Sequence, residues 1–341
     1  MVTIKEVAEL ANVSQATVSR VVNGQKRVTE STRERVLAAM NELAYQPNAF
    51  AQALASNRSS SIGMVVGNLG GFFYGPLMHT VEELARENGH HLIVTSGEDD
   101  HAKELDAINF LLSRRVDTLL LHVSAISDFE LIAMVERGIN IIILNRYVSE
   151  LAERCIYIDN EYGGYVATKH LLDLGHTKIA CITGQLNKSD SRDRLQGYRH
   201  ALQEHGLVFD KALVSEGSFD DDGGPHAARR LIQREIDFSA IVCGNDNIAI
   251  NVYDVLLEHG LRVGNDISVV GYDDAIVARY LRPKLTTVRF PIREMGKHAL
   301  KLVLQKKFGK ASEDCLKMMP ELIVRASTTK FTKADIILTK D

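Results

Sequence analysis

Two hydrophobic patterns follow one another along this chain of 341 residues. Near the N-terminus, apolar side chains recur every three or four positions, which is the spacing of amphipathic helices. From residue 62 onward, short apolar runs alternate with amphipathic stretches, which is the pattern of parallel strands connected by helices. The chain is therefore predicted to fold as a small all-α head and an α/β body.

The first predicted helix of the head begins after Thr3, whose hydroxyl can cap it. Its apolar face carries Ile4, Val7, Ala8 and Ala11. Such a one-sided helix needs a partner to cover that face.

The second predicted helix follows Ser14, another residue with a capping side chain. We expect Ala16, Val18 and Val21 to face inward. Amide and guanidinium groups pair with base edges in a major groove, and hydroxyls pair with phosphates. The pattern therefore fits a helix-turn-helix that reads DNA, although an ordinary helical hairpin has the same spacing. The outward residues are Gln15, Thr17, Ser19 and Arg20.

A third helix is predicted over residues 29–44, with Ser31 and Glu34 as a capping box. Its expected inward residues are Val36, Leu37, Met40 and Leu43. Residues 48–55, NAFAQALA, form a segment too short to be a stable free helix. We therefore divide the chain into a head (1–46), a hinge helix with its linker (47–61) and a body (62–341).

The body contains two similar halves, at about 60–160 and 161–290, and a tail from residue 292 that supplies a helix and a final strand, LIVRA. This repetition predicts two doubly wound parallel sheets with a ligand cleft at the carboxyl ends of their strands. The expected N-subdomain is about 62–160 plus 292–320, and the C-subdomain is about 161–291 plus 321–341. The predicted strands are 61–67, 91–96, 117–123, 139–145, 155–159, 178–184, 240–245 and 267–273, with helices such as 77–87, 105–114, 162–174 and 195–205.

Polar and aromatic side chains follow these strands. Sugars need this mixture, because planar polar groups bond vicinal hydroxyls while a ring face packs on an aromatic side chain. Several of these residues also have structural interpretations: Asp159 and Asp246 could cap helices, Phe73 and Tyr74 could be core aromatics, and Arg194 could be solvated. The candidates are Phe72, Phe73, Tyr74, Asn145, Arg146, Asp159, Asp190, Arg194, Asn245, Asp246 and Asp273.

The composition limits the possible classes of protein but does not identify one of them. The net charge is −4, with +2 over residues 1–60 (seven basic, five acidic) and −6 over the rest, which permits phosphate binding by the head but does not identify it. Neither a phosphate-binding glycine motif nor metal-ligand spacing occurs, so we expect that the protein is not an enzyme and that it binds neither a cofactor nor a metal. The scattered cysteines Cys155, Cys181, Cys243 and Cys315 are expected to be free thiols. Without an export signal or a membrane-length apolar run, we expect a cytoplasmic protein.

The segments 7–24 (VAELANVSQATVSRVVNG) and 27–56 resemble the lactose/galactose repressor (LacI/GalR) family, as do GHTKIACITG, DRLQGYRHAL, CGNDNIAI, ISVVGYDD and RYLRPKLTTVRFPI in the body. The resemblance implies that Gln15 and Ala16 select the base sequence, and that a hinge leucine matching Leu54 wedges open a base step in the minor groove. Apolar contact with thymine is expected from the methyl group of Ala16. The full implied DNA-binding set is Thr3, Ser14, Gln15, Ala16, Thr17, Ser19, Arg20, Asn23, Asn48, Ala51 and Leu54.

The same resemblance implies a homodimer, because two heads on a two-fold axis read a palindromic operator, and an effector that lowers operator affinity. The galactose-repressor branch is the most similar, which points to a galactose-type sugar. A β-glucoside, a co-repressor, or a sugar-binding protein without DNA regulation remain alternatives. Gly70, Gly71 and the loop with Lys188 and Asp190 depart from the family pattern, which leaves the sugar open. The implied effector-binding residues are Phe73, Tyr74, Asn145, Asp159, Arg194, Phe219, Asn245 and Asp273.

Overall fold

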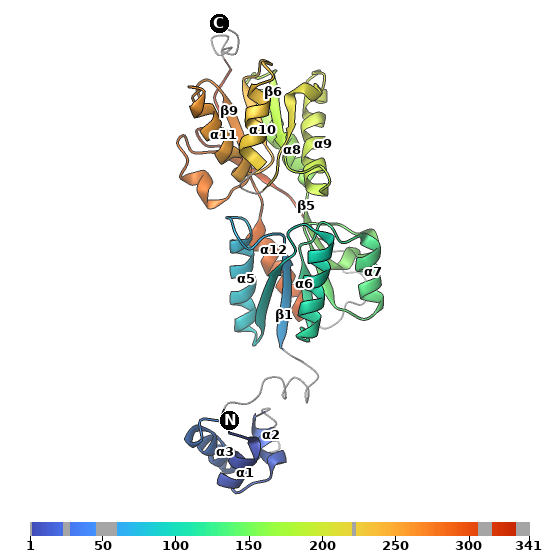
Figure 1. Cartoon of the computed structure of the whole chain (residues 1–341), viewed down its shortest axis with the longest axis vertical. Coiled ribbons are helices and arrows are strands. Elements are labelled where there is room, and N and C mark those ends of the chain that lie inside the picture. The colour runs from blue at the N-terminus through green and yellow to red at the C-terminus, as the bar shows by residue number, and fades with distance from the viewer. Residues whose placement is uncertain (1, 23–27, 46–59, 220–222, 306–315, 332–341) are drawn as a thin grey trace.

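The computed structural model describes residues 2–22, 28–45, 60–219, 223–305 and 316–331. The head consists of α1 (Ile4–Leu10), α2 (Gln15–Val22) and α3 (Glu30–Glu42) (Figure 1). One small core joins the three helices. Its buried residues are Val7, Ala8, Ala11, Val18, Val21, Val36 and Ala39.

Three details of the predicted head are wrong. Ala16 is exposed, because it lies two residues, or about 200°, from the buried Val18 around the helix. Leu37 is 46% exposed, because it lies about 100° around α3 from Val36. Ser31 does not cap α3. The helix begins at Glu30 with Thr29 as the N-cap, and no side chain accepts a capping hydrogen bond there.

The described residues of the body form two six-stranded sheets, and every strand pairing among them is parallel except that of β10 with β12. The first sheet has the order β11-β5-β4-β3-β1-β2, with β1 (Ser61–Val66), β2 (His91–Ser96), β3 (Thr118–Leu121), β4 (Ile141–Leu144), β5 (Cys155–Ile158) and β11 (Leu316–Met318). The second has the order β12-β10-β9-β8-β6-β7, with β6 (Ile179–Thr183), β7 (Val214–Glu216), β8 (Ala240–Cys243), β9 (Ser268–Asp273), β10 (Thr286–Arg289) and β12 (Glu321–Ile323).

Helices cover both sheets, as in doubly wound folds (Figure 1). We call each sheet with its helices a subdomain. The first subdomain has α5 (Tyr74–Glu87), α6 (His101–Ser113), α7 (Asp128–Glu136) and α12 (Ile292–Leu304). The second has α8 (Asn160–Asp173), α9 (Ser189–Glu204), α10 (Gly223–Ile232) and α11 (Asp246–Glu258). Short 3-10 turns occur at Ser149–Arg154 in the first subdomain and at Lys211–Leu213 and Ile276–Arg279 in the second.

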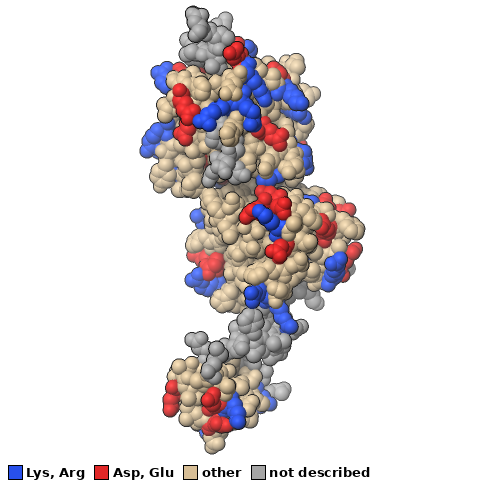
Figure 2. Space-filling model, in the orientation of Figure 1, with Lys and Arg blue, Asp and Glu red and all other residues tan. Residues whose placement is uncertain are grey.

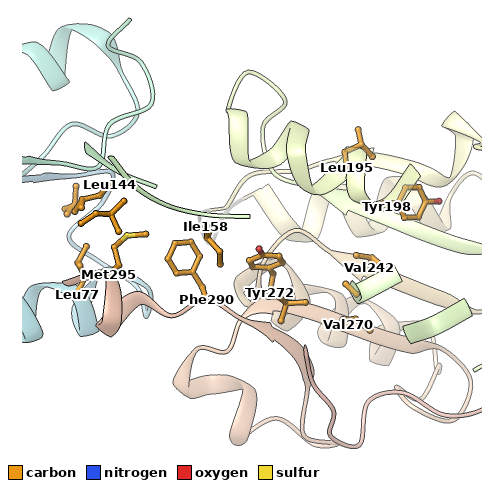
Figure 3. Close-up of a cluster of buried hydrophobic side chains, with 14 of the residues drawn as sticks. Leu77, Leu144, Ile158, Leu195, Tyr198, Val242, Val270, Tyr272, Phe290 and Met295 are labelled. Carbon is orange, nitrogen blue, oxygen red and sulfur yellow. The ribbon is translucent and has the colours of Figure 1, made fainter. Parts of the chain in front are cut away.

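The described chain passes between the subdomains three times: after β5, after β10, and between β11 and β12. A continuous apolar cluster follows these crossings. Figure 3 shows Ile158 and Phe290 between Leu77 and Met295 of the first subdomain and Val242 and Val270 of the second. The subdomains therefore share a core at the base of the cleft.

All eight predicted apolar runs contain strands, whereas β7, β10 and β11 were not predicted as strands. Their sequences, VSE, TTVR and LKM, contain only one or two apolar residues each, so they form no apolar run that would predict a strand. The described cysteines, Cys155, Cys181 and Cys243, are buried free thiols, and Cys315 lies outside the described residues. No described helix is both long and apolar enough to cross a membrane.

Candidate DNA-reading helix and effector cleft

A reciprocal capping box fixes the start of α1. The backbone N–H and the hydroxyl of Thr3 each donate to Glu6 Oε2 at 2.8 Å, and the Glu6 N–H donates to Thr3 Oγ1 at 3.4 Å. These hydrogen bonds, first the one from the Thr3 backbone, hold the pKa of Glu6 below its usual value. The box orients the helix against which α2 packs, so Thr3 has a structural role besides any contact with DNA.

The predicted recognition helix presents a polar outer face. Ser14 Oγ accepts the N–H of Thr17 at 3.2 Å and lies 2.9 Å from the Thr17 hydroxyl, so Ser14 caps α2 as expected. Gln15, Ala16 and Arg20 are exposed. The exposed methyl group of Ala16 is therefore available for contact with a base, although the residue was predicted to face inward.

Acidic and basic side chains occur together on the face of the head in view, so charge alone does not mark a DNA surface (Figure 2). Among the DNA-binding residues predicted from the sequence, the structure places Thr3, Ser14, Gln15, Ala16, Thr17, Ser19 and Arg20 in the head. The remaining four, Asn23, Asn48, Ala51 and Leu54, lie outside the described residues.

A cleft with a cavity volume of about 840 Å³ opens between the carboxyl ends of the two sheets. This volume suits a small ligand. The eight effector-binding residues predicted from the sequence all line this cleft: Phe73, Tyr74, Asn145, Asp159, Arg194, Phe219, Asn245 and Asp273.

Arg194 lies at the centre of the polar wall. The arginine is 8% exposed, and its guanidinium donates to Asn160 Oδ1 at 2.9 Å and to the Gly244 carbonyl at 2.6 Å. It also stacks 3.7 Å above the ring of Tyr272. A buried guanidinium fixed by three partners is rigid, and a surface-solvated role for Arg194 is therefore wrong.

Asp273 ends β9 and faces Arg194, with Oδ1 3.9 Å from the guanidinium. Its backbone has a φ of 109°, which side chains rarely adopt, and this turn directs the carboxyl group toward the cleft. Burial raises the pKa of Asp273 to about 7, against the lowering effect of Arg194 and with a smaller raising effect from Asp190. The carboxyl group therefore changes charge near neutral pH.

Aromatic side chains of the first subdomain form a wall of the cleft that faces Arg194 and Asp273. Phe73 packs edge-on against Tyr74 and Phe290, with ring centroids 4.9 and 5.1 Å apart. The Tyr74 hydroxyl lies 3.2 Å from His122 Nδ1, and burial raises the pKa of Tyr74 and lowers that of His122. The two aromatics line the cleft and also pack against the core, so the two interpretations of these residues are compatible.

Another aromatic side chain, that of Phe219, lines the cleft from the other subdomain. The ring of Phe219 packs so closely on the backbone that a Cβ added at Gly184 would lie 2.5 Å from it. Its carbonyl accepts from Asn245 Nδ2 at 3.1 Å and from Asn247 Nδ2 at 3.3 Å, while Asn245 Oδ1 accepts the N–H of Ile248 at 2.9 Å and caps α11. Glycine at position 184 is therefore required for the observed position of Phe219.

Asp159 and Asp246, which the sequence offers as possible helix caps, have different roles in the structure. Asp159 caps α8 through the N–H of Tyr162 at 2.9 Å and forms an ion pair with Lys317 at 2.6 Å, while still lining the cleft. Asp246 does not line the cleft or cap α11. Instead it accepts from the Thr287 hydroxyl at 2.6 Å and the Ala275 N–H at 2.7 Å, and burial raises its pKa.

Sequence reasoning missed several cleft residues. Asn160 accepts from Arg194 and lies 3.5 Å from Asn145, which connects the polar side chains of the two subdomains. Its place directly after the aspartate in CIYIDN is the signal that could have identified it. His122, at the end of DTLLLHV, has a similar position. Other lining residues that were missed include Asp99, Ser124, Asn247 and Lys317, and Lys188 was noted only as part of a variable loop.

Among the described residues, no three His, Cys, Asp or Glu side chains are grouped as metal ligands would be. The functional features are therefore a helical head with a polar exposed helix and a two-lobed body with a polar and aromatic cleft. Together they define a DNA-binding regulator with a ligand-sized cleft in its body.

The comparisons with known proteins agree with this description. Residues 3–48 match the model of bacterial regulatory proteins of the lacI family, and residues 168–328 match that of the periplasmic binding protein-like domain. The chain is 40% identical over 304 residues to the HTH-type transcriptional regulator GalR of Escherichia coli, covering 89% of each chain.

Two solved structures are similar over nearly the whole chain. The lac repressor dimer bound to operator and the anti-inducer ONPF has a TM-score of 0.83 and 30% identity, covering 96% of this chain and 99% of the other. The complex of the transcriptional regulator CelR with cellobiose has a TM-score of 0.68 and 32% identity, covering 96% and 100%. This chain belongs to the lacI family of bacterial transcriptional regulators, and it is a DNA-binding regulator rather than an enzyme.

Proposed function

We propose that this protein is a cytoplasmic repressor that binds a palindromic operator as a homodimer and releases it when a small sugar occupies the cleft. The observation that carries the proposal is the composition of the cleft. Arg194, Asn145 and Asp273 offer fixed donors and acceptors opposite the aromatic wall around Phe73 and Tyr74. A sugar presents vicinal hydroxyls and an apolar ring face, and it matches both surfaces at once.

The residues take separate roles in this proposal. The Asp273 carboxylate and the Asn145 amide accept hydrogen bonds from hydroxyls, and the Arg194 guanidinium donates to ring or hydroxyl oxygens. Phe219 packs on the C–H face of the sugar, and Asn245 and Asp159 support this arrangement from the helix starts that they cap.

In the head, Gln15 and Ala16 contact base edges, and Thr17, Ser19 and Arg20 contact the backbone together with Thr3 and Ser14. We further propose the division into head, hinge and body at 1–46, 47–61 and 62–341, with Asn23, Asn48, Ala51 and Leu54 completing the DNA contacts. One head reads only a few base pairs, so we infer that two heads on a two-fold axis read a palindrome.

Coupling follows from the shared core at the base of the cleft. A sugar that contacts both subdomains favours one relative arrangement of them, and this changes the distance at which paired hinges of a dimer meet. Loss of operator affinity by tens to hundreds of fold corresponds to a coupling free energy of about 1 to 3 kcal/mol. The free energy of effector binding must therefore differ by about this amount between the subdomain arrangement that binds operator and the one that releases it.

The test has two parts. Melting temperatures are first measured with a panel that contains D-galactose, a methyl β-glucoside and cellobiose, because a ligand that binds only the native state raises the melting temperature. Galactose is included because of the resemblance of the sequence to the galactose-repressor branch, and cellobiose is included because the chain is similar to CelR in its complex with cellobiose.

Operator affinity is then measured by fluorescence anisotropy on a selected palindrome and on a random duplex, with and without the stabilising sugar. We expect preference for the palindrome and weaker binding with sugar. Absence of any preference at moderate salt would contradict the assignment of the head, and tighter operator binding on addition of sugar would contradict release.

A further inference from the structure

An ion pair between Asp99 and Lys188 spans the cleft. Asp99 follows β2 of the first subdomain, and Lys188 precedes α9 of the second. The Lys188 ammonium donates to Asp99 Oδ2 at 2.6 Å, and the Ser124 hydroxyl donates to the other carboxylate oxygen at 2.7 Å. The side chains of Lys188 and Asp99 are 12% and 31% exposed, so the pair is partly screened from water.

This pair differs from the other ion pairs of the cleft lining. Within the described residues, Arg146 with Asp128 and Arg194 with Asp273 each belong to one subdomain. The pair of Lys317 with Asp159 lies at the crossing after β5. Only the Asp99–Lys188 pair among these joins a loop of the first subdomain directly to a loop of the second.

The same lysine contacts an aromatic side chain that lines the cleft. The Lys188 ammonium lies 5.4 Å from the centre of the Phe219 ring, and the Arg194 guanidinium lies 5.3 Å from it. The backbone around Gly184 blocks closer approach of the ring to β6. Cations within about 6 Å of a ring centre attract it. Lys188 therefore helps Arg194 to hold the Phe219 ring, and the position of Lys188 depends in turn on its ion pair with Asp99.

Electrostatics supports a charged pair rather than a neutral hydrogen bond. Burial alone would raise the pKa of Asp99, yet the hydrogen bond and charge of Lys188, with the Ser124 hydroxyl, hold that pKa below its ordinary value. The Asp99 carboxyl group is therefore ionised at neutral pH, and removal of either side chain's charge by mutation would leave the partner unpaired at the cleft.

We propose that Asp99 and Lys188 are positioning residues for the effector: their ion pair holds the subdomains close enough for one ligand to contact both, and it holds Phe219 in the position where it packs on that ligand. This inference rests on the proposed function, because it assumes that the cleft binds a sugar. It assigns the cross-cleft pair a role in effector affinity, separate from the residues that contact the sugar.

The test uses the full-length protein and titrates D-galactose and cellobiose by calorimetry. Lys188→Met and Asp99→Asn each remove one charge with little change of size, and we expect each to weaken sugar binding about tenfold. The exchanged pair Asp99→Lys with Lys188→Asp restores the opposite charges, and it should bind within about threefold of wild type. Lys188→Arg keeps the charge and should also stay within about threefold.

Lys178→Met is the matched control, because Lys178 forms an exposed ion pair with Asp237 away from the cleft lining. It should leave sugar affinity unchanged. Circular dichroism and operator binding without sugar check that each variant is folded, and we expect neither Lys188→Met nor Asp99→Asn to weaken operator binding.

The outcomes separate the two proposals. If wild type binds neither of these sugars nor the methyl β-glucoside of the panel, the proposed sugar response fails and the inference fails with it. If wild type binds a sugar but Lys188→Met binds it equally well, or the exchanged pair is as weak as the single variants, only the inference is overturned. An equal loss in Lys178→Met would also overturn it, because the effect would then not be specific to the cleft.

Discussion

Replacement of Asp273 by asparagine should change how the stability of the protein depends on pH. Burial raises the pKa of this carboxyl group from 3.8 to about 7 in the folded protein. Between these values the unfolded chain has lost the proton and the folded chain retains it. The folded state therefore binds more protons, and stability falls as the pH rises through this window.

The magnitude follows from the same shift. One pKa unit corresponds to about 1.4 kcal/mol, so the full penalty above neutral pH is about 4 kcal/mol. Of this, roughly 3 kcal/mol appears between about pH 5 and about pH 8. Asp273→Asn does not titrate and retains the shape of the side chain, so it should remove this part of the pH dependence and stabilise the protein most at high pH.

The assay is urea denaturation followed by circular dichroism at a series of pH values, since the chain has no tryptophan. Asp266→Asn is the control, because Arg262 lowers the pKa of Asp266 to about 2 and its stabilising effect is lost only in acid. The reasoning is refuted if Asp273→Asn shows the same decline as wild type between about pH 5 and about pH 8. Sugar binding should strengthen over the same range in wild type, because the ionised carboxylate is the better acceptor.

Three further predictions follow from the head and the cleft. Gln15→Ala should weaken operator binding by about 1 to 3 kcal/mol and relax the preference for one base pair, measured by anisotropy on single-base operator variants; an equal loss on random DNA would contradict base contact. Gly184→Ala should displace the Phe219 ring and reduce sugar affinity measured by calorimetry. Gly206→Ala is the control: Gly206 has open space around it but a positive φ, so this substitution should lower stability without a loss of sugar affinity. Val18→Ala removes a fully buried side chain from the small core of the head, so it should destabilise the head by about 1 to 3 kcal/mol and reduce operator binding without changing sugar affinity; unchanged proteolysis of the head would contradict this.

The fold was largely predictable from the sequence because strand and helix periodicities differ and the eight predicted strands lie in apolar runs, most of which are buried on both faces. The strands β7, β10 and β11 were missed because their sequences, VSE, TTVR and LKM, are not apolar runs, unlike the equally short β3 and β4. The position of Ala16 was predicted wrongly because alanine fits either face of a helix, although its separation of about 200° from the buried Val18 places it on the opposite face of α2.

The candidate site was predictable in part. Residues that directly follow predicted strands, such as Asn145 and Asp273, reach the cleft because parallel strands end at one edge. Asp246 also follows a strand, yet the Thr287 hydroxyl and the Ala275 N–H hold it below the surface, and strand position alone does not reveal such partners. The cross-cleft pair of Asp99 with Lys188 depends on the distance between two sheets, which no local pattern encodes.

The return of α12 to the first subdomain affects how the protein is made. Met295, Ala299 and Leu300 of this helix lie in the same core as Leu77 and Val81, far earlier in the chain. While a ribosome is still adding the intervening residues, at about 5 to 20 per second, that core lacks one wall. The first subdomain therefore cannot complete its core for a time on the order of ten seconds or more, during which its apolar surface is exposed to chaperones. A stop codon that truncates the chain before α12 would leave this subdomain unable to complete its fold.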